Sequence, residues 1–339
     1  MVVGREKKGN DMFLVLLQYL LLASTFTLGK AAIHYASPVF FISVRMLLAG
    51  SLLLGYMYFF NKKSWQFSTK DILSYAQLTL FHIYISFLCE FWALQYVSSA
   101  KACLLYNLSP FVTALFSYCM FAERLNGKKW LGLAIGLFGF LPILLAHAPK
   151  EGIAGQLWGL SLPEISLLIS VCSSAYAWLL IKKLIQHKGY SILMLNGIAM
   201  TSGGVLAFIT SLFVDGAPRV SCCAASGDSL GAYFTAVLGT QEIGFLMFMI
   251  YLIALIIIAN IICFNIYGFL LRRYSATFLS FAGFTTPLFA AVWGYVLLAE
   301  TIGWHFFASL GITFVGLYLF YQQELKDKNN IPNTHSLSE

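Results

Sequence analysis

Ten apolar segments, each about as long as a helix that crosses a bilayer, constrain this fold more than any other feature. They cover approximately residues 12–33, 38–60, 73–96, 102–121, 129–147, 165–185, 190–214, 243–270, 276–298 and 304–321. Charged residues make up only 10% of the chain, against about 25% in soluble domains. Strands of a membrane barrel would alternate in hydropathy, and these segments do not. The sequence therefore predicts an all-α membrane protein with ten transmembrane helices.

Lysine and arginine are distributed unequally between the two sides of the predicted bundle. When the loops are assigned to alternate sides, most of the 21 basic residues share a side with both chain ends. Because retained lysine and arginine mark the cytoplasmic side, we predict that both termini are cytoplasmic. These loops account for the net charge of +7, and no basic groove with interleaved aromatic residues is present. No nucleic-acid partner is expected.

One sequence pattern occurs twice. Residues 109–125 read SPFVTALFSYCMFAERL and residues 286–302 read TPLFAAVWGYVLLAETI, with proline, alanine, tyrosine, alanine and glutamate at the same places. Gly139 and Gly316 continue the match. The copies fall on the fourth and ninth segments, so each unit has five helices and the two units enter the membrane from opposite sides. Many secondary transporters use such inverted repeats for alternating access to a site at the bilayer midplane.

These observations predict an order of parts along the chain. The parts are a cytoplasmic N-terminal segment (1–11), a first five-helix repeat (12–147), an outer linker (148–164), a second five-helix repeat (165–321) with a long outer loop (215–242), and a cytoplasmic polar tail (322–339). We expect Pro110 and Pro287 to bend the fourth and ninth helices, which is tolerated beside protein or a water-filled cavity. A duplicated structural bundle without transport is the alternative interpretation.

The chain resembles the drug/metabolite transporter superfamily, of the EamA-like type with five plus five helices. The resemblance is carried by ASTFTLGKAAIHYASP (23–38), FISVRMLLAG (41–50) and both proline-to-glutamate stretches with the glycine-rich segments that follow. It implies ten helices and the carriage of small organic solutes across a bacterial inner membrane. These motifs do not name a substrate.

A second resemblance is to the S-adenosylmethionine/S-adenosylhomocysteine transporters of obligate intracellular bacteria. It is carried by the aromatic-rich composition, Glu90 within the third segment and the long loop between the seventh and eighth segments. It implies uptake of S-adenosylmethionine in exchange for S-adenosylhomocysteine. The alternative is a proton-coupled exporter of amino acids or drug-like metabolites.

Ionisable side chains inside apolar segments are costly, and we treat them as candidates for substrate binding. Lys30, Arg45, Glu90 and Lys101 all fall in the outer third of the predicted membrane region. An acid among bases suits a substrate that carries both charges. In the alternative interpretation, the lysines extend to the interface and Arg45 bonds to a backbone carbonyl. Glu90 needs a partner or a proton.

Polar and aromatic side chains extend this set. His82, Ser86 and Glu90 are spaced by four residues and share one helix face, which either lines a cavity or joins two helices. Aromatic rings can stack on a planar base or hold a cation, although most rings in such a chain fill the core or face lipid. The further candidates for substrate contact are Tyr106, Asn107, Asn260, Phe264 and Phe284.

Motifs for other protein classes are missing from the sequence. No Walker loop, GxSxG, HExxH or zinc-ligand spacing is present. We therefore expect no cofactor, no metal site and no enzymatic activity. A membrane transferase would need acidic metal-binding motifs in its cytoplasmic loops, and a receptor or scaffold would not need two inverted halves. The sequence predicts a secondary transporter whose partners are a small metabolite and the lipid bilayer, and it does not determine the oligomeric state.

Overall fold

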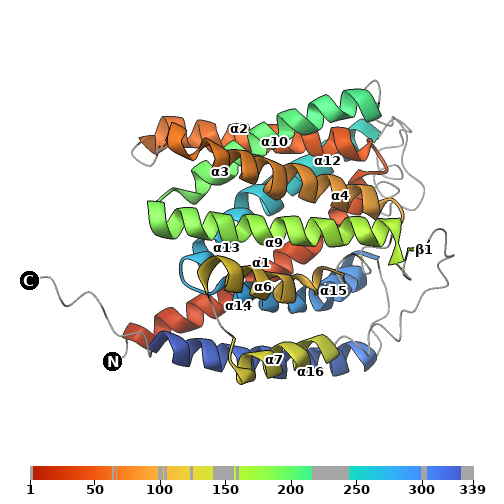
Figure 1. Cartoon of the computed structure of the whole chain (residues 1–339). Coiled ribbons are helices and arrows are strands. Elements are labelled where there is room, and N and C mark those ends of the chain that lie inside the picture. The colour runs from red at the N-terminus through yellow and green to blue at the C-terminus, as the bar shows by residue number, and fades with distance from the viewer. Residues whose placement is uncertain are drawn as a thin grey trace, which may run out of the picture.

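The computed structural model describes residues 3–62, 65, 67–97, 102, 105–122, 125–139, 156–157, 160–215, 244–298 and 304–329. The regular secondary structure of these residues is helical, apart from β1 (Gln156–Leu157) and β2 (Leu160–Ser161), which pair antiparallel. The helices run roughly parallel and antiparallel to one another in a layered bundle (Figure 1). Lys101, Glu123, Glu300 and the loop 216–243 lie outside the described residues.

Helices of the first half occupy the segments that hydropathy predicted. They are α1 (Val3–Ala32), α2 (Pro38–Phe60), a third rod made of η2 (Thr69–Asp71), α3 (Ile72–Gln77), η3 (Leu78–Tyr84) and α4 (Ile85–Leu94), then α6 (Ser109–Phe121) and α7 (Gly127–Phe138). The segment η3 is a π-helix.

Helices of the second half follow the same order. They are α9 (Leu162–Lys188), α10 (Ile192–Val214), a rod made of α12 (Gly244–Leu255), η4 (Ile256–Cys263) and α13 (Phe264–Leu271), a rod made of α14 (Ala276–Ala282), η5 (Gly283–Thr285) and α15 (Thr286–Leu298), and α16 (Trp304–Asn329). The segment η4 is a second π-helix, in the rod that corresponds to the third rod of the first half.

Six of these rods are long and apolar enough to cross a membrane, and α6 and Ala276–Ala290 are shorter apolar helices. Large apolar side chains are exposed on them, such as Phe213 at 85% and Phe60 at 78%. Exposure on this scale marks a surface that is covered by something other than water. The prediction of a helical membrane protein is confirmed, while the ten-span count and the side on which the termini lie stay predictions.

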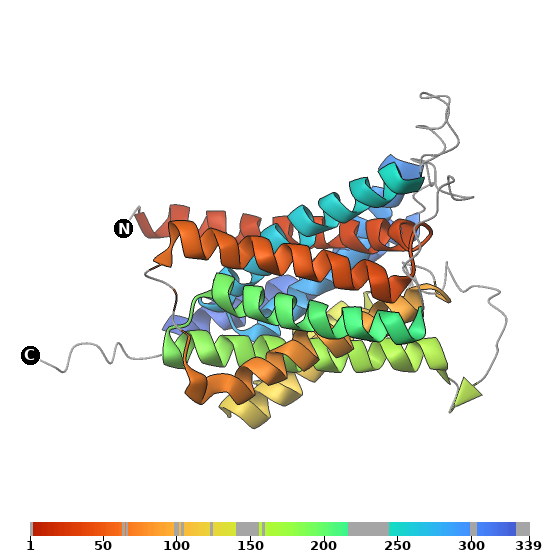
Figure 2. The same ribbon diagram turned by 90° about the horizontal axis from the view of Figure 1, so that it is seen from above.

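Each half packs against the other through matching helices. Figure 2 shows α2 and α10 side by side, and α7 lies along α16 at one edge of the bundle (Figure 1). A Cβ atom added to Gly316 would lie 2.7 Å from the backbone oxygen of Gly132 and 2.7 Å from the backbone nitrogen of Gly136. Only glycine allows α7 and α16 to approach this closely.

Regular helix stops just before both repeated prolines. The expected continuous helix 102–121 is interrupted by a turn at residues 107–108, and α6 then starts with Pro110 in its first turn. In the second half, the 3₁₀ segment η5 ends directly before α15, whose second residue is Pro287. Proline lacks an N–H group and disfavours helix in the residue before it. The expected bend is therefore a break between two helical pieces.

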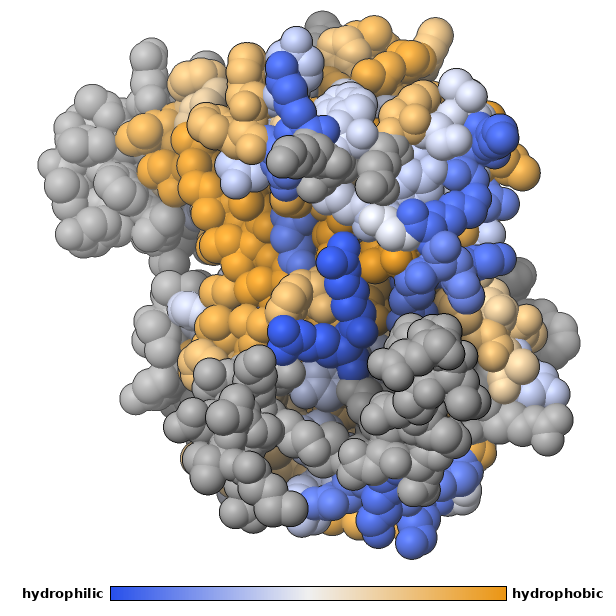
Figure 3. Space-filling view, turned by 90° about the vertical axis from the view of Figure 1, so that its left-hand side faces the viewer, coloured by the Kyte–Doolittle hydropathy of each residue, from blue (hydrophilic) through white to orange (hydrophobic). Residues whose placement is uncertain are grey.

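Hydrophilic side chains gather at the end of the bundle where α1 begins and α16 ends (Figure 3). The loops and helix ends on this side carry Lys62, Lys70, Lys188 and Arg273. Asp71 accepts hydrogen bonds here from Lys188 and from the Tyr190 hydroxyl, so the start of the third rod is tied to the end of α9.

Candidate functional site

A cavity lies inside the bundle, where the broken helices of both halves meet. Its wall is built from α1, α2, η3, α4, α6, α9, η4, α13, α14, η5 and α15, together with Tyr106 in the segment before α6. Irregular backbone at membrane depth is found where it is buried in protein or lines a cavity. The two π-helices and the two breaks before proline therefore all border the same space.

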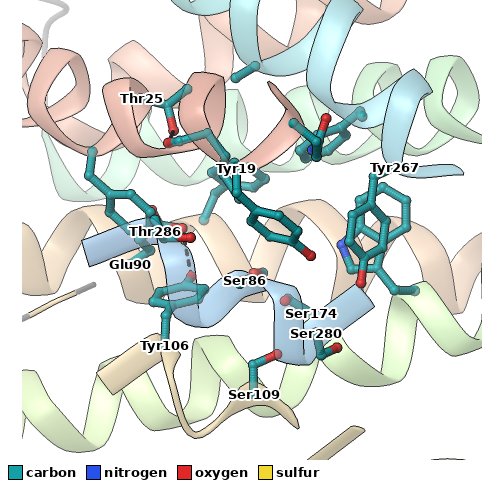
Figure 4. Close-up of a pocket in the computed structure, with 18 of the residues that line it drawn as sticks. Tyr19, Thr25, Ser86, Glu90, Tyr106, Ser109, Ser174, Tyr267, Ser280 and Thr286 are labelled. Atoms are coloured by element: carbon teal, nitrogen blue, oxygen red, sulfur yellow. Dashed lines mark hydrogen bonds between the residues drawn. The ribbon is translucent and has the colours of Figure 1, made fainter. Parts of the chain in front are cut away.

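A carboxylate marks one part of the cavity wall. Glu90 of α4 accepts a hydrogen bond from the hydroxyl of Tyr106 at 2.8 Å, as Figure 4 shows. The Tyr106 hydroxyl also lies 2.7 Å from Oγ of Ser170, and this Oγ donates to the backbone oxygen of Ser86 at 2.8 Å. The chain of bonds fixes the position of the carboxylate. Among the described residues that line the cavity, Glu90 is the only carboxylate.

A buried arginine provides the opposite charge. Arg45 of α2 is 2% exposed, and its Nε donates to Oδ1 of Asn260 at 2.7 Å. Its guanidinium carbon lies 5.2 Å from the ring centre of Phe87 and 5.8 Å from that of Phe91. The amide and the ring faces compensate for part of the lost hydration of the cation. In the described part of the chain, Arg45 forms no ion pair with Glu90, although the two charges lie in one cavity and attract each other.

Four rings form an aromatic cluster, which we define as His82, Trp178, Phe264 and Tyr267. The Trp178 ring centre lies 4.6 Å from that of His82, 5.3 Å from that of Phe264 and 4.4 Å from that of Tyr267. His82 is 2% exposed; its ring nitrogens make no regular hydrogen bond among the described residues, but its ring interacts with the side chain of Asn196. The cluster offers ring faces to a flat ligand and imidazole nitrogens that can bond to it.

Hydroxyl groups occupy much of the remaining wall. Figure 4 shows Ser109, Ser174 and Ser280 on one side of the space and Tyr19 reaching towards Tyr267. The Tyr19 hydroxyl donates to the backbone oxygen of Leu279, which ties α1 to α14. Such groups suit a polar metabolite better than a purely apolar one.

The cavity brings together some of the residues that the sequence predicted, and leaves others outside its lining. Arg45, His82, Glu90, Tyr106 and Phe264 line the cavity. Asn260 is fully buried behind Arg45 and holds its guanidinium.

Three predicted residues lie elsewhere. Lys30 donates from Nζ to the backbone oxygen of Val97 at 2.8 Å, just beyond the end of α4. Asn107 is buried outside the lining, in the turn before α6, and its amide nitrogen lacks a partner among the described residues. Phe284 is fully buried and packs edge-on against Phe281, with ring centres 4.9 Å apart. Its ring belongs to the hydrophobic core.

Several lining residues were not predicted, chiefly those of α1. Gln18 and Tyr19 line the cavity, with Thr25 and Phe26 one to two turns further along the helix. The sequence carries a signal for Gln18, because it is the one amide in the apolar run that starts at Met12. An amide in a membrane helix needs a hydrogen-bond partner, either a neighbouring helix or a ligand.

Comparison with protein families agrees with this architecture. A family model described as the EamA-like transporter family matches residues 11–145 and 161–322. The chain belongs to this family. The prediction of a membrane transporter is thereby confirmed, and the protein is a multi-pass EamA-like transporter of a bacterial inner membrane.

Relatives of this EamA-like transporter differ in what they are described as carrying. The S-adenosylmethionine/S-adenosylhomocysteine transporter of Chlamydia muridarum is 34% identical over 93% of this chain and 92% of that protein. A probable amino-acid metabolite efflux pump of Salmonella typhimurium is 24% identical over 91% of this chain and 94% of that protein. A crystal structure with 14% identity superposes with a TM-score of 0.63, covering 94% of this chain and 97% of the other, so the fold is shared.

Proposed function

We propose that this EamA-like transporter takes up S-adenosylmethionine across the inner membrane in exchange for S-adenosylhomocysteine. One observation carries the proposal: a single cavity presents Glu90, Arg45 and the aromatic cluster without pairing the two charges. The similarity to the Chlamydia transporter, 34% over nearly the whole chain, supports the same substrate pair.

The chemistry of the ligands matches the groups in the wall. Both compounds carry an amino-acid group and an adenine ring, and S-adenosylmethionine has an additional positive sulfonium. In the proposal, Glu90 binds a cationic group and the guanidinium of Arg45 binds the carboxylate. The aromatic cluster stacks on the adenine ring. The remaining predicted residues, Lys30 and Phe284 among them, act on this site only through packing and helix position.

Alternating access requires two halves that exchange roles, and we propose ten spans in two inverted repeats with both termini cytoplasmic. Repeated contacts support this arrangement. Gly139 approaches Thr313, and Gly316 approaches Gly136, so one contact occurs twice with the halves exchanged. A two-fold axis produces such reciprocal contacts. The family match also falls into two parts, one on each predicted repeat (12–147 and 165–321).

The packing of whole helices supports the same axis. The third rod of the first half packs on α9, and the corresponding rod of the second half packs on α1. In the same way, α6 packs on α9 and α15 packs on α1. The basic loops at the end where α1 begins support a cytoplasmic location for that end.

Purified protein in liposomes tests the substrate and the coupling. Uptake of labelled S-adenosylmethionine is expected when the liposomes contain S-adenosylhomocysteine, and not when they are empty. Uptake into empty liposomes that follows only an imposed pH gradient would contradict the exchange. That result would favour the second candidate, a proton-coupled exporter of amino acids or drug-like metabolites, which the Salmonella relative and the cavity carboxylate Glu90 support.

A further inference from the structure

Gln18 is a buried amide that faces the cavity with an unused hydrogen-bonding group. Its side chain is 2% exposed and lines the cavity. Its Oε1 has no hydrogen-bond partner among the described residues. A buried polar group without a partner is costly, and native proteins rarely leave one in that state without a reason. An unsatisfied amide oxygen on a cavity wall points to a ligand that donates a hydrogen bond to it.

Gln18 lies at the part of the cavity that holds the aromatic cluster. Its backbone oxygen lies 3.9 Å from Sγ of Cys263, the residue before Phe264. The next residue, Tyr19, reaches towards Tyr267 (Figure 4). Gln18 and the four rings of the aromatic cluster therefore line the same cavity, and the Gln18 amide oxygen has no hydrogen-bond partner among the described residues.

These groups together define the kind of ligand that fits. Ring faces select a flat ligand, and a carboxamide presents a donor and an acceptor side by side. An aminopurine has the complementary pair on one edge, an amino group beside a ring nitrogen, and glutamine is a common bidentate partner of adenine for this reason. Neither Glu90 nor Arg45 supplies such a pair, since a carboxylate only accepts and a guanidinium only donates.

We propose that Gln18 and the aromatic cluster form a base-binding subsite for an aminopurine, in which the Gln18 carboxamide bonds to the exocyclic amino group. The subsite rests on the proposed function, because it places the adenine ring of the two substrates. Gln18 acts as a specificity-determining residue, and the amino-acid group of the same ligand binds at Glu90 and Arg45.

A double-mutant cycle, in which Gln18 is changed in the protein and the 6-amino group is removed from the ligand, tests the subsite. Purified protein binds labelled S-adenosylhomocysteine, in competition with unlabelled S-adenosylhomocysteine or with its analogue that has hydrogen in place of the 6-amino group. The wild-type protein is expected to bind the analogue at least about 5-fold more weakly, since the amide of Gln18 again loses its partner. In Gln18→Leu, both ligands are expected to bind equally well, because the group that distinguishes them is gone.

Controls separate the possible failures. Gln95→Leu makes the same change at an exposed position outside the cavity lining and should keep the wild-type preference. Gln18→Met, which matches glutamine in length, replaces Gln18→Leu if that variant does not fold. A wild-type protein that does not distinguish the two ligands, or a folded Gln18 variant that keeps the full preference, would overturn the subsite. Absence of any S-adenosylhomocysteine binding by the wild type would instead contradict the proposed function.

Discussion

Glu90→Gln is the substitution that most directly tests the charge arrangement in the cavity. It removes the negative charge but keeps the shape of the side chain and an oxygen that can accept the 2.8 Å hydrogen bond from Tyr106. The packing around α4 should therefore stay unchanged. A half-buried carboxylate that loses its charge also no longer carries the free-energy cost of desolvation, so the folded protein is not expected to lose stability.

The size of the effect follows from the bond that the carboxylate makes with a cationic substrate group. A hydrogen bond to a charged group contributes about 1.5–3 kcal/mol. Lost from the substrate complex, this corresponds to a KM for S-adenosylmethionine that is about 10- to 150-fold higher. Comparison of the two substrates locates the bond. An equal loss of affinity for both substrates places Glu90 at the shared ammonium group. A loss of affinity for S-adenosylmethionine alone places Glu90 at the sulfonium.

Initial uptake rates into liposomes that contain S-adenosylhomocysteine measure this change, with protein abundance in the membrane quantified in parallel. Glu164→Gln is the matched control, because Glu164 caps the start of α9 through Ser161 and does not line the cavity. It should leave the KM unchanged. If Glu90→Gln has wild-type KM and rate at equal abundance, Glu90 does not contact the substrate and the proposed charge arrangement is wrong.

Three further predictions test other parts of the structure. Arg45→Lys removes the planar group that bonds to Asn260 and lies over Phe87, so uptake should fall about tenfold. Competition by the methyl ester of the substrate, which lacks the carboxylate, should stay unchanged. An equal loss of affinity for the ester and the acid would contradict the role of Arg45. Gly316→Ala places a methyl group 2.7 Å from backbone atoms of α7 and should lower the melting temperature of the purified protein. Gly311→Ala, the control on the same helix, places a methyl group with no tertiary neighbour within 4 Å among the described residues and should leave the melting temperature unchanged. Exchange moves one net positive charge inwards, because only the incoming substrate has a sulfonium, so a potassium diffusion potential of 100 mV, negative inside, should raise the accumulation ratio by about 50-fold. Accumulation that ignores the potential would show that a compensating ion, such as a proton, moves with the exchange.

Much of the helical arrangement could be predicted from hydropathy, because lipid leaves no alternative to helices for apolar segments of this length. The predicted bounds 38–60 coincide with α2, and 276–298 coincide with the rod from α14 to α15. The π-helices η3 and η4 could not be predicted, since their residues are ordinary helix formers and the extra residue in each turn is set by packing against other helices. His82 and Asn260 lie in these two segments.

The sequence pointed to residues that line the cavity where a residue is anomalous in its own segment. A charge in an apolar helix, such as Glu90 or Arg45, is unusual enough to be noticed without a structure. Small polar residues such as Ser280 and Thr286 are common in membrane helices, where they also serve close packing. Only the three-dimensional arrangement shows that these two line the cavity. Phe284 shows the converse, because a position before a repeated proline suggested substrate contact and the ring is buried in the core.

Under the proposed exchange, the same unpaired groups explain why the transporter would not return empty. To change sides, the cavity must close around whatever it holds. Closure over an empty cavity would leave Glu90 and Arg45 without a mutual ion pair, and the Gln18 amide without a partner. Burying two charges without an ion partner, and an amide oxygen without a donor, raises the free energy of the closed state, although Tyr106 and Asn260 each provide a hydrogen bond to one of the charges. Either substrate supplies an ammonium, a carboxylate and a base edge and so lowers this barrier. Strict exchange then follows from the cavity itself, because only the loaded protein closes readily.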